Sequence, residues 1–275
     1  MEQASGQTVV AEQLPRRGGL SGGGIKLLAI GLMLLDHVGA VVLERLLVAR
    51  GLTQLATNEQ VAAFLAENGA LYWADFALRL LGRVAFPLFC FLLVEGFLHT
   101  HSVRRYALRL AAFALISEVP FDLATSGPLL GKTTWWNPAY QNVFFTLLLG
   151  LLTIWAMETC AKRAAWPKWG QILAQVGVCA AGMGAAILLQ TDYDFTGVLA
   201  IVLFYVLHRR RNVAAAAGCA ALLTKGMMEG AGFAALVPIR FYNGQRGPRL
   251  KYFFYCFYPV HLLLLWLVCV GLGVA

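Results

Sequence analysis

Long stretches of hydrophobic residues recur along the whole chain, and short polar segments separate them. Nine such stretches can be delimited, at residues 25–43, 76–97, 106–123, 143–157, 172–189, 195–207, 213–223, 231–239 and 253–274. They are continuous and do not alternate with polar residues, whereas a membrane β-strand alternates over about ten residues. The pattern therefore predicts an all-α, polytopic integral membrane bundle of about nine transmembrane helices, within a range of about eight to ten.

Three stretches, 195–207, 213–223 and 231–239, are shorter than the roughly 17–25 residues that a full span requires, which predicts short or broken helices there. Residues 1–24 have a Gly-rich end and no apolar segment with a cleavage site, so we expect a disordered cytoplasmic tail. Residues 25–275 are then expected to form a single transmembrane, acyltransferase-like domain. Residues 50–69 are expected to form a polar insert on the outer face.

Composition excludes an ordinary soluble enzyme. Of the 275 residues, 59% are hydrophobic and 13% are charged, against about 25% charged in a typical soluble domain. The net charge of +8 comes from residues between the hydrophobic stretches, which favours the positive-inside rule over a nucleic-acid partner. The six cysteines have no CxxC spacing, so neither a disulfide scaffold nor a metal site is expected.

The basic residues also predict the topology. With the amino terminus inside, most of the 22 Lys and Arg residues fall in segments that alternate as inner loops. We therefore expect a multi-pass protein of the bacterial cytoplasmic (inner) membrane, in contact with membrane lipid, with its amino terminus inside and its carboxyl terminus outside.

The first helix carries Asp36 and His37 within an otherwise apolar run. Ionisable groups inside a membrane are costly and usually face a functional cavity. At 1.5 Å per residue, His37 lies roughly 18 Å from the inner end, just beyond the midplane. This position suits a general base, although a histidine that only bonds two helices together would give the same pattern.

The second helix carries Asp75, Arg79 and Arg83 at a spacing of four, which places them on one face. Arg79 can pair with Asp75 or bind substrate. Arg83 can pair with Asp36 or Glu118, or bind a ligand anion.

Further acids and amides are expected in the outer half of the membrane. Glu118 and Asp122 are four residues apart in the third helix, with Pro120 between them. Asn142 opens the fourth helix and Asp194 precedes the sixth. Because several of these groups would face a histidine within the membrane, a reaction centre is the favoured interpretation.

At the inner side, Glu95 ends the second helix and can bind substrate or contact the basic loop that follows. The last inner loop is basic and suits a phosphate-bearing ligand, although plain positive-inside topology also explains it. His261, within the last helix, is a second candidate acid, base or ligand. The polar residues of that loop are Arg240, Asn243, Arg246 and Lys251.

The linked motifs IKLLAIGLMLLDHVGA, GRVAFPLFCFLLVEGFLHT, RLAAFALISEVPFDLA and YNGQRGPRLKYFFYCFYPVHLLLL resemble those of the TraX family, membrane proteins associated with amino-terminal acetylation of pilin subunits. The resemblance covers residues 25–265. The first helix is also similar to the wider membrane acyltransferase class, in which a basic residue precedes a buried histidine by eleven positions, here Lys26 and His37.

The resemblance implies transfer of an acetyl group from acetyl-CoA to an acceptor, either directly or through an acetyl-histidine. A pilin amino terminus is one candidate acceptor, and a glycan, lipid or small amine remains open. On this hypothesis the catalytic residues are His37, Asp36, Arg83 and Glu118. The residues expected to hold acetyl-CoA are Lys26, Arg240, Asn243, Arg246, Lys251 and His261. Those expected to bind the acceptor are Arg79, Glu95, Asp122, Asn142 and Asp194.

Two other functions are compatible with the sequence. Short helices with intramembrane acids and two histidines also suit a proton-coupled transporter of small solutes. Alternatively, the polar groups only specify helix packing in a noncatalytic assembly protein for a surface filament. Turnover of a thioester separates acyl transfer from both alternatives.

Overall fold

The computed structural model describes residues 18–126, 134–247 and 251–275, and only the backbone of residues 251 and 252. Apart from two isolated bridge pairs, the regular secondary structure in these ranges is helical, which confirms the predicted all-α class. The helices are α1 (Gly22–His37), α2 (Glu44–Ala49), α3 (Asn58–Gly82), α4 (Ala85–Leu98), α5 (Val103–Thr125), α6 (Val143–Ala161), α7 (Lys168–Leu188), α8 (Asp194–Val206), α9 (Arg211–Leu222), α10 (Leu236–Arg240) and α11 (Lys251–Gly271). A π-helical segment, Val38–Leu43, joins α1 to α2, and a 3-10 segment, Met227–Ala235, precedes α10.

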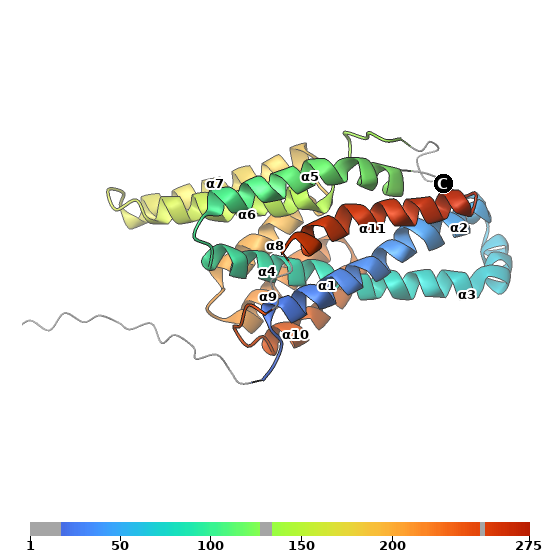
Figure 1. Ribbon diagram of the computed structural model, residues 1–275, viewed down its shortest axis with the longest axis horizontal. Helices are drawn as coiled ribbons and strands as arrows, with labels where there is room; N and C mark the ends of the chain where they lie inside the picture. The colour runs from blue at the N-terminus through green and yellow to red at the C-terminus, as the bar shows by residue number, and fades with distance from the viewer. Residues whose placement is uncertain (1–17, 127–133, 248–250) are drawn as a thin grey trace, which may run out of the picture.

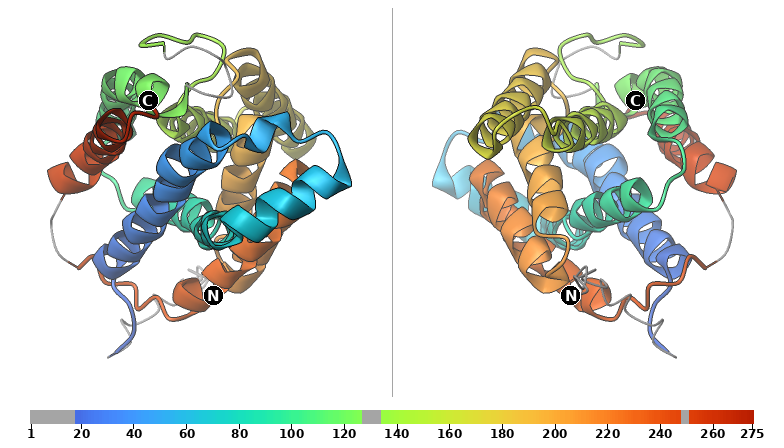
Figure 2. Two further views of the ribbon diagram at one scale, coloured as in Figure 1. Left: turned by 90° about the vertical axis from the view of Figure 1, so that its right-hand side faces the viewer. Right: turned by 90° about the vertical axis from the view of Figure 1, so that its left-hand side faces the viewer.

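The helices run along the long axis of the molecule (Figure 1). Helix α1 begins toward the left in this view, short of the tip where α6 and α7 meet, and runs toward the right-hand end, where the carboxyl terminus lies. Figure 2 looks along this axis and shows the other helices arranged around α4. Most side chains of α4 are buried, because it packs against α1, α6, α8 and α9.

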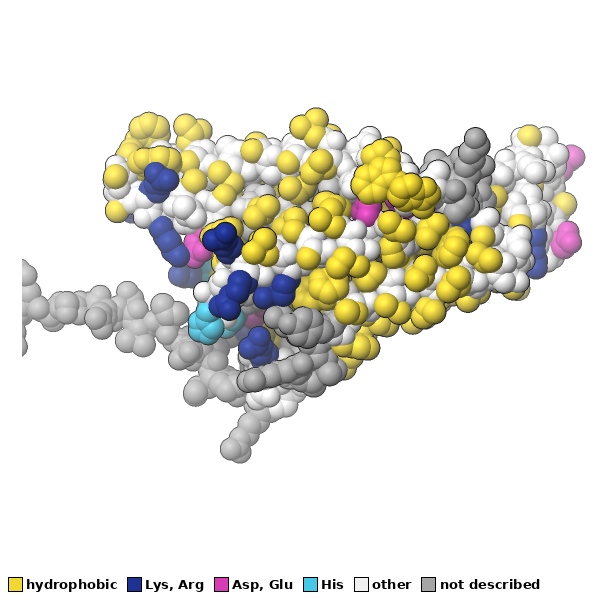
Figure 3. Space-filling model, turned by 45° about the horizontal axis from the view of Figure 1, so that its top comes forward, with side chains coloured by type: hydrophobic (Ala, Val, Ile, Leu, Met, Phe, Trp, Pro, Cys, Tyr) yellow, Lys and Arg dark blue, Asp and Glu magenta, His cyan; other side chains and the backbone are white. Residues whose placement is uncertain are grey.

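Five segments in the described part of the chain are long and apolar enough to cross a membrane: Gly22–Ala49, Asn58–Leu98, Val143–Ala161, Lys168–Leu188 and Phe253–Gly271. The protein is therefore a polytopic membrane protein, but the predicted number of nine spans is not confirmed. Helices α8 and α9 have only 13 and 12 residues, as their short hydrophobic stretches predict. Hydrophobic side chains cover the middle of the surface, and Lys and Arg gather at the end where α1 begins (Figure 3).

The first helix starts at Gly22 and not at Ile25. Ser21 caps it by accepting a hydrogen bond from the Gly24 amide, and the amides of Gly22 and Gly23 donate to the carbonyls of residues 245 and 246. Residues 18–24 are thus held against the last inner loop, so the part of the expected disordered tail that the structure describes is ordered. Residues 1–17 lie outside the described part of the chain.

The second helix was predicted at residues 76–97, and this prediction was wrong in two ways: the helix starts earlier, and it is divided into α3 and α4. Helix α3 begins at Asn58, where Thr57 and Gln60 form a capping box, so much of the expected polar insert is helical. The rod then breaks between Gly82 and Ala85. Pro87 explains the break, because it has no amide hydrogen to donate to the carbonyl of Arg83 four residues earlier.

Two glycines let α1 and α3 approach closely. A Cβ atom added at Gly82 would lie 2.2 Å from the Cβ of Asp36, and one added at Gly39 would lie 2.9 Å from Oδ1 of Asp75. Protein interiors give way poorly to such overlaps. The glycines therefore set the distance at which Asp36 can meet the arginines of α3.

Substituting Gly82→Ala is expected to lower the free energy of unfolding by about 1–3 kcal/mol, because the new methyl group overlaps Asp36. Gly69→Ala, in the same helix, is the matched control, since a Cβ there meets no atom within 4 Å. That control should be neutral or raise stability by up to about 1 kcal/mol. Thermal unfolding of the purified protein in detergent measures both; similar midpoints for the two variants would contradict this packing.

Candidate functional site

Helix α1 delivers Asp36 and His37 to the middle of the bundle and then changes its geometry. The amide of Glu44 donates to the carbonyl of Gly39, five residues earlier, as in a π-helix. Such single π turns shift the side chains that follow around the helix axis and are frequent at functional sites. The segment puts Glu44 and Arg45 in the wall of the cavity that His37 also lines.

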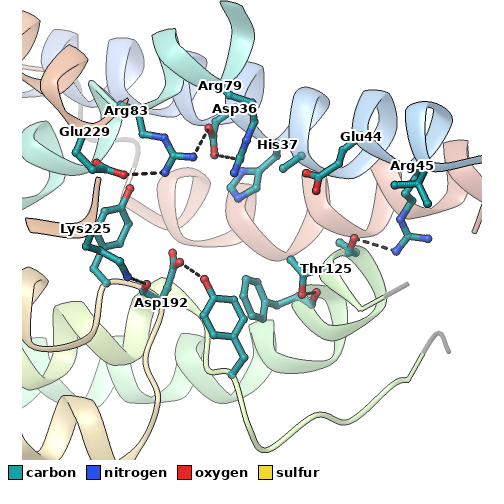
Figure 4. A pocket seen from close by; sticks show the side chains of 16 residues that line it. Asp36, His37, Glu44, Arg45, Arg79, Arg83, Thr125, Asp192, Lys225 and Glu229 are labelled. Atoms are coloured by element: carbon teal, nitrogen blue, oxygen red, sulfur yellow. Dashed lines mark hydrogen bonds and ion pairs between the residues drawn. The ribbon is translucent and has the colours of Figure 1, made fainter. Parts of the chain in front are cut away.

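A chain of ion pairs links three helical segments beside His37 (Figure 4). Arg79 Nη1 lies 2.9 Å from Asp36 Oδ2, and Arg83 Nη2 lies 3.8 Å from Asp36 Oδ1. Arg83 Nη1 lies 3.0 Å from Oε1 of Glu229, in the 3-10 segment. Alternating charges stabilise one another here, because each would be costly alone inside a membrane.

These groups border a cavity of about 350 Å³, called here the outer cavity. Its walls come from α1, the π segment, α2, α3 and the end of α5, together with Tyr140, Asp192, Tyr193, Lys225 and Glu229. Asp192 and Tyr193 directly precede the short helix α8, and Lys225 and Glu229 follow the short helix α9. Tyr140 donates a hydrogen bond to Asp192, and Lys225 Nζ donates to the Asp192 carbonyl at 2.6 Å. Burial raises the pKa of Asp192, and the Asp192 carboxylate raises the pKa of Tyr140.

His37 is bonded to a second histidine. His261 Nε2 lies 2.9 Å from His37 Nδ1, and His261 Nδ1 lies 2.8 Å from the Phe257 carbonyl oxygen. A carbonyl can only accept, so Nδ1 of His261 carries a hydrogen, and its Nε2 accepts when the ring is neutral. His37 Nδ1 is then the donor, which leaves Nε2 of His37 unprotonated and able to act as a base.

A second cavity, of about 390 Å³ and called here the inner cavity, lies toward the end where α1 begins. Its polar lining includes Lys26, Glu95, His99, Arg109 and Arg246. Its apolar lining includes Ile30, Met33, Leu92, Phe144, Leu147 and Tyr258. A basic group of residues next to an apolar space suits a ligand with an anionic head and a less polar arm.

Tyr258 and His37 separate the two cavities. Tyr258 lines the inner cavity and is only 2% exposed, and its ring centroid lies 5.9 Å from that of His37. Met33, one helical turn before His37, lines the inner cavity, whereas His37 lines the outer one. The His37 side chain thus belongs to the wall between two spaces of different chemistry.

Comparisons with known proteins place the chain in a family. The model of the TraX protein family matches residues 21–269. The chain belongs to the TraX family. It is also 30% identical, over 234 residues, to the probable fimbrial assembly protein FimC, serogroup H1, of Dichelobacter nodosus, a match that covers 77% of this chain and 89% of that protein. No solved structure matches the chain.

In this TraX family member, four of the residues expected in catalysis or acceptor binding meet in the outer cavity: Asp36, His37, Arg79 and Arg83. Arg79 pairs with Asp36 and not with Asp75. The hydrogen bonds and ion pairs described for Asp36 go to arginines and not to His37. The residue that bonds the His37 imidazole is His261, which was expected to bind acetyl-CoA.

Other expected site residues lie apart from both cavities. Glu118 and Asn142 are buried and bonded to each other at the start of α6. Asp122 accepts from the Asn137 amide at 2.6 Å and so holds the loop before α6. Asp194 begins α8 and pairs with Lys225. In the structure these groups stabilise turns and helix ends.

At the inner side, the structure divides the expected donor-binding residues. Lys26 and Arg246 line the inner cavity together with Glu95, which was expected to bind the acceptor. Arg240 is exposed and lines neither cavity, and Asn243 bonds within its own loop and to Gly19. The side chain of Lys251 lies outside the described residues.

Several cavity residues were not among the expected site residues. Glu44 and Arg45 follow the first hydrophobic stretch, and Arg109 lies close to two other arginines, Arg104 and Arg105, near the start of the third stretch. The sequence could have indicated Glu229 as a site residue, because it is the one acid in the apolar segment between Met227 and Ile239. An isolated acid in such a segment favours a buried partner.

Asp36→Asn is expected to lower the free energy of unfolding by about 2–3 kcal/mol, since it leaves Arg79 and Arg83 without their shared carboxylate. Asp194→Asn is the matched control. The Asp194 pair with Lys225 is about one-third exposed, and asparagine can still accept the hydrogen bond from the Thr196 amide, so the loss should be under about 1 kcal/mol. Thermal unfolding in detergent compares the two; equal losses would contradict a stabilising role for the buried chain.

Proposed function

We propose that this protein transfers an acetyl group from acetyl-CoA, bound in the inner cavity, to an amine held in the outer cavity. The observation that carries the proposal is the position of His37, which is bonded through Nδ1 to His261 and lies in the wall between a basic, apolar-lined cavity and a charged one. Membership of the TraX family and the similarity to a fimbrial assembly protein support an acceptor such as a pilin amino terminus.

The inner cavity fits the donor in charge and in length. Lys26, Arg109 and Arg246 supply cations for the phosphates of CoA, and the apolar residues beyond them would surround the pantetheine arm. The eleven residues from Lys26 to His37 rise about 16 Å along the helix. An extended arm of that length brings the thioester to the wall formed by Tyr258 and His37.

In the proposed reaction, the neutral amine attacks the thioester carbonyl carbon, and His37 Nε2 accepts the proton that the nitrogen loses. The new C–N bond forms as the C–S bond breaks, and the proton on His37 passes to the departing thiolate. A route through acetyl-His37 uses the same nitrogen as the nucleophile. In both routes His261 would hold the imidazole in the required tautomer, and the guanidinium of Arg83, which lines the outer cavity, would stabilise negative charge.

This function predicts an orientation. Acetyl-CoA is a cytoplasmic metabolite, so the basic end of the molecule, where α1 begins, would face the cytoplasm. The carboxyl terminus and the outer cavity would face the opposite side of the bacterial inner membrane, where surface filaments are assembled. The positive-inside rule favours the same orientation.

His37→Gln is expected to lower acetyl transfer by about 10²–10⁴-fold, because it removes the base and keeps a similar side-chain volume. His208→Gln is the control, since His208, just after α8, bonds the Tyr205 carbonyl, has no other hydrogen-bond partner in the part of the chain that the structure describes, and is not a lining residue of either cavity. Release of CoA thiol and mass spectrometry of a peptide amine measure the two variants. Turnover by the His37 variant at the wild-type rate would remove His37 from the mechanism, and proton-coupled solute flux without thiol release would favour a transporter.

Arg246→Ala is expected to raise the KM for acetyl-CoA about tenfold, with little change in kcat, because it removes one charge-assisted contact to the donor. Arg240→Ala, in the same basic segment but outside the inner cavity, should leave the KM unchanged. Initial rates at varied donor concentration decide between them. An equal rise in both variants would indicate a general electrostatic effect and not a donor site in the inner cavity.

A further inference from the structure

The outer cavity extends along α1 and α2 beyond His37. Asp36, His37, Ala40, Glu44, Arg45 and Val48 all line it. Figure 4 shows the order of the charged groups: Glu229 and Arg83 at one end, then Asp36 and His37, then Glu44, and Arg45 at the other end. A cavity that accepted only a small amine at His37 would not need this charged extension.

Arg45 has hydrogen-bond capacity that the described residues do not fill. It is only 3% exposed, and its Nη2 donates to the carbonyls of Leu123, Ala124 and Ser126 at 2.8–3.0 Å, which satisfies the end of α5. Its Nη1 is buried and has no hydrogen-bond partner among the described residues. A buried charged donor without an acceptor is costly, and a ligand anion in the cavity would supply one.

Glu44 provides the complementary charge. Its side chain is half-buried in the cavity, between His37 and Arg45, and no ion pair forms between it and the described residues. Two other acids that line the cavity, Asp36 beside it and Glu229 at the far end, are already paired with arginines. A free carboxylate next to the proposed base is suited to an ammonium group, which it would hold until the proton is lost.

We infer that the acceptor is an extended peptide whose amino terminus binds between His37 and Glu44 and whose acidic side chain, three or four residues further along, binds Arg45. This inference rests on the proposed function for the role of His37. The eight residues from His37 to Arg45 rise about 12 Å along the helix. An extended chain covers about 3.3 Å per residue, so, when the amine is in place at His37 for transfer, a carboxylate on the fourth or fifth residue of the acceptor would reach Arg45.

The test measures peptide binding first and acetyl transfer to the same peptides second. Fluorescently labelled octapeptides with a free amino terminus would carry a single Glu at one of positions 2 to 6, with Gln at the others, and their Kd for the full-length protein in detergent would be measured. Peptides with Glu at position 4 or 5 are expected to bind about tenfold tighter than the all-Gln peptide. Acetylating the amino terminus in advance should weaken binding of every peptide, because Glu44 then loses its cation.

Arg45→Gln should remove the preference for Glu over Gln. The matched control is Arg50→Gln, because Arg50 is exposed and bonds Asn68 outside the cavity, and this variant should keep the preference. If Arg45→Gln does not fold, the wild-type peptide series still decides the question. Equal affinity for Glu and Gln peptides would overturn the inference, whether or not they are acetylated. If the protein prefers Glu peptides but transfers no acetyl group to them from acetyl-CoA, the result would support the binding mode and count against the proposed acetyl transfer.

Discussion

The ion-pair chain Arg79–Asp36–Arg83–Glu229 is the constraint on which the rest of the site depends. Charges inside a membrane protein must find partners, and these four groups come from α1, from α3 and the break after it, and from the 3-10 segment before α10. The pairs form only because Gly39 and Gly82 let α1 and α3 approach closely. The same contact places His37, the next residue after Asp36, against α11, where His261 bonds it.

Two cavities follow from the unequal lengths of the helices around this chain. Helices α8 and α9 end where the outer cavity begins, whereas α1 with α2, α3 and α5 continue beyond them. On the other side of His37 and Tyr258, the basic residues of α1, α5 and the last inner loop surround the inner cavity. One histidine can therefore serve reagents that enter from opposite ends, which is what transfer from a cytoplasmic thioester to an external amine requires.

The sequence predicted the helical membrane class and the intramembrane position of Asp36, His37, Arg79 and Arg83, because charged residues within apolar runs are conspicuous. Pro87 is a local sign of the break between α3 and α4, but the helices were delimited by hydropathy, which does not take proline into account. They were therefore expected as one shorter helix. The contact between His37 and His261 was not predicted, since nothing local says that residues 37 and 261 meet. Glu118 was expected at the site and instead bonds Asn142, because helix rotation within the bundle depends on packing. The π turn that positions Arg45 likewise has no simple sequence signature.

Transfer between two separated compartments tests the central claim most directly. Purified protein would be reconstituted into sealed vesicles in one orientation, with labelled acetyl-CoA confined to the side of the basic end and a peptide amine confined to the other. Acetylated peptide should accumulate only in the compartment of the peptide, while all CoA thiol stays with the donor. Product formation only when both reagents share one side would contradict a reaction centre between two opposed cavities.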